Sequence, residues 1–173
     1  MILGIDPGVN NIGIVFLENN KGLKLKESHI YTVPKPESSG YLDFVDYFTK
    51  LTNRELHIIG IEKPFFTPMT LANNIRTLEV IGLMKYVLYC NGHTEITMLS
   101  PATIKKTVTG NGRAQKSEII DCVEKLFSVD LKKNSHIADA IGVAMTAHAT
   151  SLDIKDSGKL SKKKGTKRRQ MLE

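Results

Sequence analysis

Four residues of types that bind divalent cations occur in three separate segments of the chain. Asp6 lies in ILGIDPG, Glu62 lies in HIIGIEKPFF, and His136 and Asp139 both lie in NSHIADAIGVAM. Each segment joins an apolar run to a turn or a helix start, so side chains far apart in the sequence could converge. Two divalent ions about 3.5 to 4 Å apart can bridge a scissile phosphate. The pattern therefore predicts a metal-dependent phosphodiesterase.

Each of the four residues also has a structural interpretation when it is taken alone. Asp6 before Pro-Gly could open a turn, and Glu62 could be a surface residue at the end of a strand. His136 could cap the last helix, as could Ser135 or Asn134, and Asp139 could complement the dipole of that helix. Taken together, the acids follow or interrupt apolar segments, where a half-buried carboxylate needs a partner. Oxygen ligands and one imidazole suit Mg²⁺ or Mn²⁺. We predict two such ions, held by all four residues.

The elements that must position these residues follow from the hydrophobic periodicity. Short apolar runs between turn residues predict strands, and a spacing near 3.6 predicts helices. The expected strands cover residues 2–5, 12–17, 23–33, 57–61 and 95–99, and the expected helices cover 41–51, 71–89, 102–107, 116–127 and 137–149. The order βββαβαβααα predicts an α/β domain with a five-stranded mixed sheet, three antiparallel strands followed by two parallel ones, flanked by helices.

This order places the candidate ligands at one edge of the sheet. The first and fourth strands are expected to be parallel neighbours, so Asp6 and Glu62 should emerge side by side at their carboxyl ends. His136 and Asp139 are three residues apart and should project from one face of the last helix. In the helix at 71–89, the residues expected to be buried are Leu71, Ile75, Leu78, Ile81 and Leu88.

Length and charge indicate one domain followed by a basic tail. A chain of 173 residues with a net charge of +6 has room for one domain with a full core. Residues 151–173 hold eight basic and three acidic side chains, a net charge of +5, which leaves residues 1–150 with a net charge of +1. We predict a nuclease domain over 1–150 and a disordered tail over 151–173 that suits a polyanion. The tail could instead aid solubility, and its KKKGTKRR run could pass for a nuclear localisation signal.

The cysteines and the hydropathy of the chain indicate the cellular compartment in which the protein is expected. Cys90 and Cys122 are far apart and have neither disulfide nor metal-site spacing. No stretch approaches the roughly 18 apolar residues of a membrane-spanning helix, and MILGID has no basic leader. These features predict a protein without membrane contact in the bacterial cytoplasm, or in the host cytoplasm if the gene is phage-borne.

Four segments, in the same order, resemble the RuvC family of Holliday junction resolvases in the ribonuclease H-like superfamily. They are ILGIDPGVNNIGIVF, IGIEKPFF, TIKKTVTGNGRAQKSEI and HIADAIGVAMTAH, and the resemblance covers nearly all of residues 1–150. It implies that Asp6, Glu62 and Asp139 are metal-binding catalytic acids of a crossover junction endonuclease. It also implies a homodimer that makes paired symmetric nicks in a four-way DNA junction, a symmetric substrate matched by a two-fold protein.

The chain departs from that family pattern in two places. Many relatives have aspartate where this chain has His136, although some have histidine, and the change lowers the negative charge of the site by one. We predict that His136 is a ligand or a general base, and that it favours Mn²⁺. The basic tail has no counterpart in the familiar bacterial pattern, which indicates a phage-borne version and leaves branch-migration partners and any cleavage-sequence preference open.

The resemblance further implies DNA contacts in the basic segment. Lys105 and Lys116 match it and flank the Gly110-Asn111-Gly112 loop, whose glycines allow close approach of the DNA backbone. Lys106 and Arg113 are near enough in the sequence to assist. Each of these cations could also be a solvated surface residue.

An aromatic residue after the second acidic motif is the other implied contact. Phe65 aligns with a ring that the family places by the junction, where stacking on an unpaired base is worth roughly 1 to 3 kcal/mol. Phe66 is its alternative, and either ring could belong to the core. The helix at 71–89 offers apolar surface for both the core and a dimer contact.

Three other functions share part of this sequence pattern with a junction resolvase. Actin-like ATPases and sugar kinases also begin with a strand and Asp-x-Gly, but they need a second domain and another glycine-rich motif. A noncatalytic junction-binding protein would not need the complete acidic set. A broader debranching nuclease for forks, flaps, three-way junctions or RNA/DNA hybrids would keep both the fold and the metals.

Overall fold

The elements of the chain occur in the predicted order. The computed structural model describes residues 1–8, 10–33, 40–66 and 71–169, with the side chains of all of these except 71–73 and 155–169. The strands are β1 (Ile2–Pro7), β2 (Asn11–Asn19), β3 (Leu23–Thr32), β4 (Ile58–Glu62) and β5 (Thr97–Leu99). The helices are α1 (Gly40–Thr52), α2 (Leu71–Cys90), α3 (Pro101–Thr109), α4 (Lys116–Phe127) and α5 (Ser135–Arg169).

The described strands form one mixed sheet in the order β3-β2-β1-β4-β5. The β1–β2 and β2–β3 pairs are antiparallel, and the β1–β4 and β4–β5 pairs are parallel. This is the predicted arrangement of three antiparallel strands followed by two parallel ones. β1 lies at the centre of the sheet, and its residues from Ile2 to Ile5 are all buried, as expected for a strand covered on both faces.

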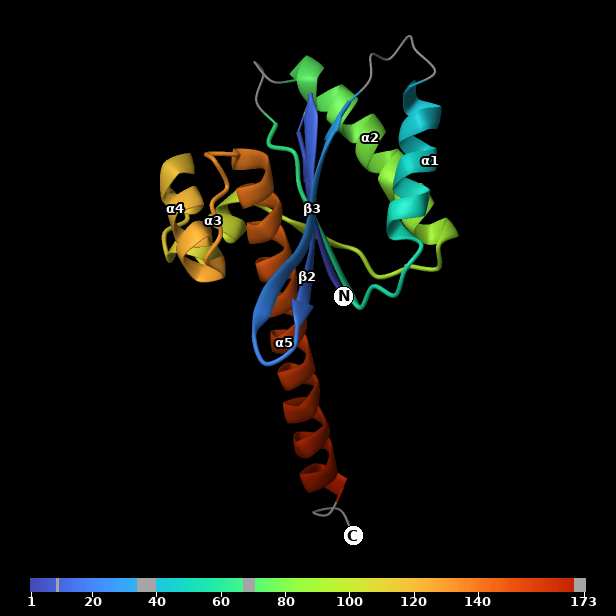
Figure 1. Ribbon diagram of the computed structural model, residues 1–173. Helices are drawn as coiled ribbons and strands as arrows, with labels where there is room; N and C mark the ends of the chain where they lie inside the picture. The colour runs from blue at the N-terminus through green and yellow to red at the C-terminus, as the bar shows by residue number, and fades with distance from the viewer. Residues whose placement is uncertain (9, 34–39, 67–70, 170–173) are drawn as a thin grey trace.

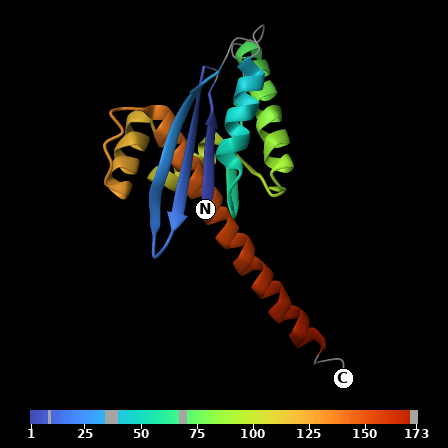
Figure 2. The same cartoon turned by 45° about the vertical axis from the view of Figure 1, so that its right-hand side comes forward.

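Helices cover both faces of the sheet, so the molecule has three layers. Figures 1 and 2 show α1 and α2 on one face and α3, α4 and α5 on the other. Each face has its own hydrophobic core: Phe16, Phe44 and Met84 belong to the α1–α2 side, whereas Val15 and Ile141 belong to the α5 side. Alternate residues of β2 therefore serve opposite cores, as the two-residue period of a strand requires.

α5 lies unusually close to the sheet because three strand residues have no side chain. A Cβ atom on Gly4 would lie 2.2 Å from the carbonyl oxygen of Ala140, and one on Gly60 would lie 2.8 Å from the Cβ of Ala147. A Cβ on Gly13 would lie 2.2 Å from the carbonyl oxygen of His136. Since real Cβ atoms do not approach so closely, glycine at these positions sets the distance between the helix and the strands.

The buried face of α2 differs in part from the predicted one. Ile81 and Leu88 are buried as predicted, but the prediction is wrong for Ile75 and Leu78, which are 54% and 45% exposed. Asn74 and Thr77 are buried instead. Leu71 lies outside the described side chains. α2 is apolar around most of its circumference, so the period alone could not select its buried face.

α5 is longer than the sequence analysis expects. It begins at Ser135 and continues past the expected end at residue 149 to Arg169, so residues 151–169 are helical where a disordered tail is expected. Lysine and arginine are good helix formers, and this part extends away from the sheet (Figure 1). Within the described part of the chain, no helix has both the length and the apolar content needed to cross a membrane.

Candidate active site

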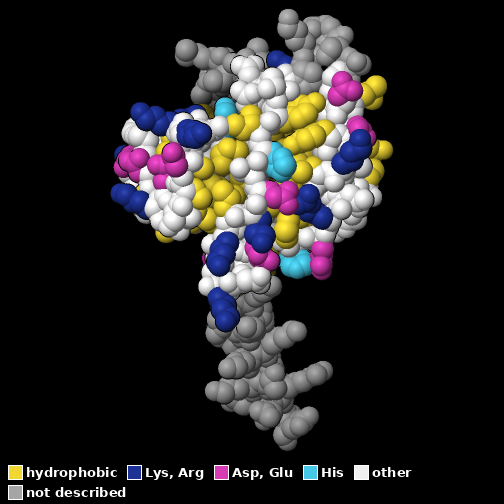
Figure 3. Space-filling view, viewed as in Figure 1, with side chains coloured by type: hydrophobic (Ala, Val, Ile, Leu, Met, Phe, Trp, Pro, Cys, Tyr) yellow, Lys and Arg dark blue, Asp and Glu magenta, His cyan; other side chains and the backbone are white. Residues whose placement is uncertain are grey.

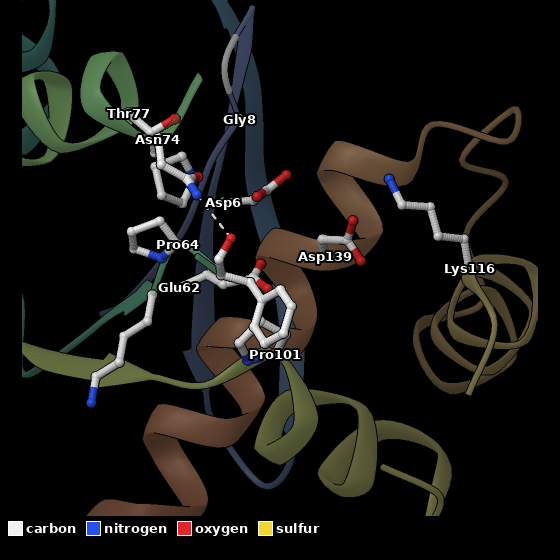
Figure 4. Close-up of a pocket in the computed structure, with 12 residues that line it drawn as sticks. Asp6, Gly8, Glu62, Pro64, Asn74, Thr77, Pro101, Lys116 and Asp139 are labelled. Atoms are coloured by element: carbon white, nitrogen blue, oxygen red, sulfur yellow. Dashed lines mark hydrogen bonds between the residues drawn. The ribbon is translucent and has the colours of Figure 1, made fainter. Parts of the chain in front are cut away.

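Three acidic residues from three different elements line one pocket. β1 and β4 are parallel neighbours, and Ile5 pairs with Ile61, so Asp6 and Glu62 emerge at the same edge of the sheet. Asp139 lies in the first turns of α5, whose start is held beside that edge by the close packing against Gly13. The pocket has a volume of about 240 Å³ and contains all three carboxylates (Figure 4).

His136 joins this group through Asp6. Its Nδ1 atom lies 2.9 Å from Oδ2 of Asp6, and the two side chains are 32% and 14% exposed. His136 lies at the edge of the pocket, where a Cβ atom on Gly8 would come within 3.1 Å of its ring. Asn134 caps the start of α5: its side-chain oxygen accepts a hydrogen bond from the backbone N–H of Ile137. His136 is therefore left to interact with the carboxylate.

Glu62 and Asp139 lie in a buried environment that disfavours their charged forms. Burial, followed by the negative charges of Asp6 and Asp139, raises the pKa of Glu62 from 4.5 to about 8. Burial and the charge of Asp6 likewise raise the pKa of Asp139 from 3.8 to about 6. The hydrogen bond to Asp6 raises the pKa of His136 above 6.5. A cation placed among these groups would offset both the burial and the charge repulsion that cause the first two shifts.

The donor set fits a divalent cation in its chemistry, but the ligands are not yet gathered around one point. Carboxylate oxygens with one imidazole are typical ligands of Mg²⁺ and Mn²⁺. Among the described residues, no three His, Cys, Asp or Glu side chains already lie close enough together to enclose an ion. Asp6 is bonded to His136 instead. An ion would have to replace that contact or share Asp6 with it.

The predicted basic residues differ in their distance from the acids. Lys116, at the start of α4, lines the pocket, and Figure 4 shows its side chain extending toward Asp139. Lys105 is half-buried on α3, and its positive charge partly opposes the rise in the pKa values of Glu62 and Asp139. Lys106 and Arg113 are exposed on the same α3–α4 segment, and the structure does not place them among the described pocket residues.

Of the two aromatic candidates, Phe65 lies at the rim of the same pocket. Phe65 lines it and is 71% exposed, and Phe66 beside it is 52% exposed. Neither ring is part of the core. Several lining residues were not predicted from the sequence, among them Lys63 and two buried polar residues of α2, Asn74 and Thr77, which are 7% and 5% exposed. The signal available in the sequence was weak, because Asn74 and Thr77 are only two of several polar residues in the first half of this helix.

Comparison with known proteins identifies the family. The family "Crossover junction endodeoxyribonuclease RuvC" matches residues 2–148. The RuvC protein of Prochlorococcus marinus (strain MIT 9312) is 31% identical over 152 residues, which cover 84% of this chain and 94% of the relative. That of Rickettsia typhi (strain ATCC VR-144 / Wilmington) is 31% identical over 157 residues, 87% of this chain and 98% of the relative.

The fold agrees with this assignment. The structure described as "T. thermophilus RuvC in complex with Holliday junction substrate" matches with a TM-score of 0.70 and 20% sequence identity, over 85% of this chain and 93% of that chain. The predicted ribonuclease H-like fold is thereby confirmed. The chain belongs to the RuvC family of crossover junction endodeoxyribonucleases, which are metal-dependent nucleases.

Proposed function

We propose that this protein is a structure-selective DNA endonuclease that resolves four-way junctions by paired symmetric nicks. The observation that carries the proposal is the convergence of Asp6, Glu62 and Asp139, from β1, β4 and α5, on one pocket that also contains Lys116. Membership of the RuvC family and the likeness to a RuvC structure with its Holliday junction substrate support the choice of substrate.

Asp6, Glu62 and Asp139 would hold the metal, and Mg²⁺ or Mn²⁺ fits these oxygen donors best. Two bound ions would supply an activated water and charge stabilisation for the leaving oxygen of the scissile phosphate. The ends of β1 and β4 and the start of α5 hold the three carboxylates, which would in turn fix the position of the reacting phosphate. Lys116 extends into the pocket and would contact a phosphate oxygen of the bound strand.

His136 has two roles open to it, and both act at the carboxylate end of the pocket. It could become a ligand through its ring nitrogen, or it could accept a proton from the attacking water as a general base. Its contact with Asp6 supports either role, because it places the imidazole next to a proposed ligand. The neutral ring is required in both cases.

DNA contacts would spread from the pocket over the α3–α4 segment and the rim. Lys105, Lys106, Arg113 and Lys116 would bind backbone phosphates, which position the substrate without reading its sequence. Phe65 would stack on a base at the crossover, where bases are least constrained by neighbours. Its high exposure leaves the ring available for this contact.

The exposed face of α2 is the proposed homodimer contact. Ile75, Leu78, Tyr86 and Tyr89 are between 45% and 64% exposed, and their spacing of three, eight and three residues keeps them on one helical stripe. Gly82 lies within this stripe, and a Cβ atom there would meet nothing within 4 Å. A second copy of the helix would bury the stripe and create the two-fold arrangement that paired nicks require.

Residues 151–173 are proposed to be a basic segment separate from the nuclease domain, acting on DNA in the cytoplasm of a bacterium or of a phage-infected host. Their eight basic residues suit a polyanion. The helix carries them away from the pocket, because α5 begins at the pocket and runs toward the opposite end of the sheet (Figure 1).

A panel of matched synthetic substrates tests the function. The protein would be incubated with a four-way junction, a three-way fork, a flap, a linear duplex and an RNA/DNA hybrid, each with Mg²⁺, with Mn²⁺ and with chelator. We expect symmetric, metal-dependent nicks confined to the four-way junction. Asp6→Asn, Glu62→Gln and Asp139→Asn should each abolish cutting and retain junction binding.

Two outcomes would replace this proposal. Comparable cutting of forks and flaps would make the protein a broader debranching nuclease. Junction binding by the wild type without cutting under any metal condition would make it a noncatalytic junction-binding protein. Loss of binding in all three acid variants would mean that the carboxylates are structural.

A further inference from the structure

Phe65 is exposed at the rim of the pocket, and Phe66, the next residue in the chain, is also exposed. Phe65 is 71% exposed and Phe66 is 52% exposed, three and four residues after Glu62. An exposed aromatic side chain at a pocket is suited to contact the molecule that the pocket binds. Phe65 also lines the pocket, so the contact would be made by the molecule that occupies it.

The backbone that carries these rings is held at several points. The N–H of Lys63 donates to the carbonyl of Leu99 in β5 at 2.7 Å. Pro64 has its φ angle restricted by its ring. The carbonyl of Phe65 accepts a hydrogen bond of 2.8 Å from the side-chain amide of Asn74 on α2, drawn as a dashed line from Asn74 in Figure 4.

Asn74 is buried, and burial of an amide is unfavourable unless it is hydrogen-bonded. Its exposed fraction is 7%, and it shares its face of α2 with Thr77 and with the core residues Val80, Ile81 and Met84. An apolar side chain at this position would be easier to bury. The bond to Phe65 satisfies one N–H of the amide and links the helix directly to the segment that carries both rings.

We propose that Asn74 is a positioning residue for strand opening: it holds the segment of Phe65 and Phe66 so that both rings can stack on unpaired bases at the crossover. This inference rests on the proposed function and deepens it, because it concerns how the same pocket selects its substrate. A segment fixed in advance loses little conformational freedom when its rings stack, so more of the stacking energy is available to separate base pairs.

The inference distinguishes two kinds of junction. In a fully paired junction, the rings must compete with base pairing at the crossover, so the position of the segment matters. In a junction with noncomplementary bases at the crossover, the opening has already occurred, and the position of the rings should matter little. Loss of a merely structural hydrogen bond would slow the cutting of both junctions equally.

Asn74→Leu removes the hydrogen-bond donor and keeps the approximate volume of the side chain. Asn74→Ala is a second variant, which removes the donor by shortening the side chain. Asn91→Leu is the matched control. Asn91 lies just beyond the other end of α2, and its side-chain amide donates to the carbonyl of Thr49 and the hydroxyl of Thr52 at 3.1 and 2.9 Å. It has the same side chain and the same type of bond but does not belong to the pocket.

The experiment measures cutting rates of each full-length variant on the paired and the pre-opened junction. The ratio of the two rates is compared, because it does not depend on the fraction of active protein. For Asn74→Leu and Asn74→Ala, we expect this ratio to fall about five- to tenfold from the wild-type value, as loss of one hydrogen bond can produce. For Asn91→Leu the ratio should be unchanged.

A fluorescent base analogue at the crossover gives an independent readout in the presence of chelator. Wild type and Asn91→Leu should increase its fluorescence on binding, and the Asn74 variants should increase it less at saturating protein. A wild-type ratio in both Asn74 variants, with full fluorescence, would overturn the inference while the proposed function stands. Failure of the wild type to cut either junction would overturn both.

Discussion

Nδ1 of His136 lies 2.9 Å from Oδ2 of Asp6, although the two residues are 130 positions apart in the chain. The contact joins the first strand to the first turn of the last helix at the edge of the pocket. It couples the protonation of an imidazole to a carboxylate that we propose as a metal ligand. A metal ion and a proton on His136 would therefore compete for the same end of the pocket.

Replacement of His136 tests its role. His136→Ala should lower the cutting rate by about 100-fold or more, because it removes either a ligand or a general base. His136→Asp supplies another oxygen donor and should retain cutting to within about tenfold of wild type, as expected if metal binding is the main role. The measurement is single-turnover cutting at saturating Mg²⁺ and Mn²⁺. Wild-type rates in His136→Ala would remove the residue from the site.

The stability of the metal-free protein should decrease as the pH rises from about 4.5 to about 8. The folded protein binds protons at Glu62 and Asp139 more tightly than the unfolded chain, because their pKa values rise to about 8 and about 6. The contribution of these two groups to the free energy of unfolding is complete at pH values below their pKa in the unfolded chain. It is lost as the pH rises through their pKa in the folded protein, by at most about 1.4 kcal/mol per pH unit for each group.

Thermal unfolding with chelator at a series of pH values measures this effect, and Glu62→Gln is the control. The variant should show a smaller decrease in Tm over the same range, because its amide does not titrate. Added Mg²⁺ should raise the wild-type Tm more at pH 8 than at pH 5.5, since it binds the ionised carboxylates. Identical pH profiles for wild type and Glu62→Gln would contradict the prediction.

Lys116→Ala should weaken junction binding and reduce its dependence on salt. One lost phosphate contact lowers the slope of log affinity against log salt concentration by about 0.9. Lys50→Ala is the matched control, because Lys50 lies on α1 and pairs with Asp46 at 2.6 Å, away from the pocket. Binding would be measured in chelator at several salt concentrations. An unchanged slope in Lys116→Ala would remove this lysine from the DNA surface.

Charge on the exposed stripe of α2 should disrupt the dimer. Leu78→Glu places a carboxylate where two copies of the stripe would meet, and we expect a monomer by analytical ultracentrifugation at micromolar concentration. Leu42→Glu is the control, because Leu42 is also an exposed leucine, at 73%, but lies on α1. A Leu78→Glu protein that remains dimeric would place the interface elsewhere.

Removal of residues 155–173 should weaken general duplex binding without changing the chemical step. All eight basic residues of the tail lie in this range. With a rise of about 1.5 Å per residue, Lys155 is about 24 Å along α5 from Asp139. We expect a smaller salt slope for duplex binding and an unchanged cutting rate at saturating junction. A slower single-turnover rate in the shortened protein would assign the tail to the reaction itself.

The strand order and the placement of Asp6, Glu62 and Asp139 were predictable from the sequence. Apolar runs bounded by turn residues identify strands, and a crossover between the first and fourth strands makes them parallel, which brings their carboxyl ends together. The same logic could not select the buried face of α2. That helix has apolar residues on most sides, so Ile75 and Leu78 looked as suited to the core as Ile81.

The sequence by itself determined the candidate acids and the strand order of the sheet, because both depend on local features: apolar runs, turn residues and the acids that follow or interrupt these runs. Only the tertiary structure decided which partners meet across long separations. The His136–Asp6 contact depends on the close packing of α5 against Gly13. The Asn74–Phe65 hydrogen bond depends on which face α2 turns toward the rest of the protein. Both are set by side-chain packing between distant elements, which periodicity does not encode.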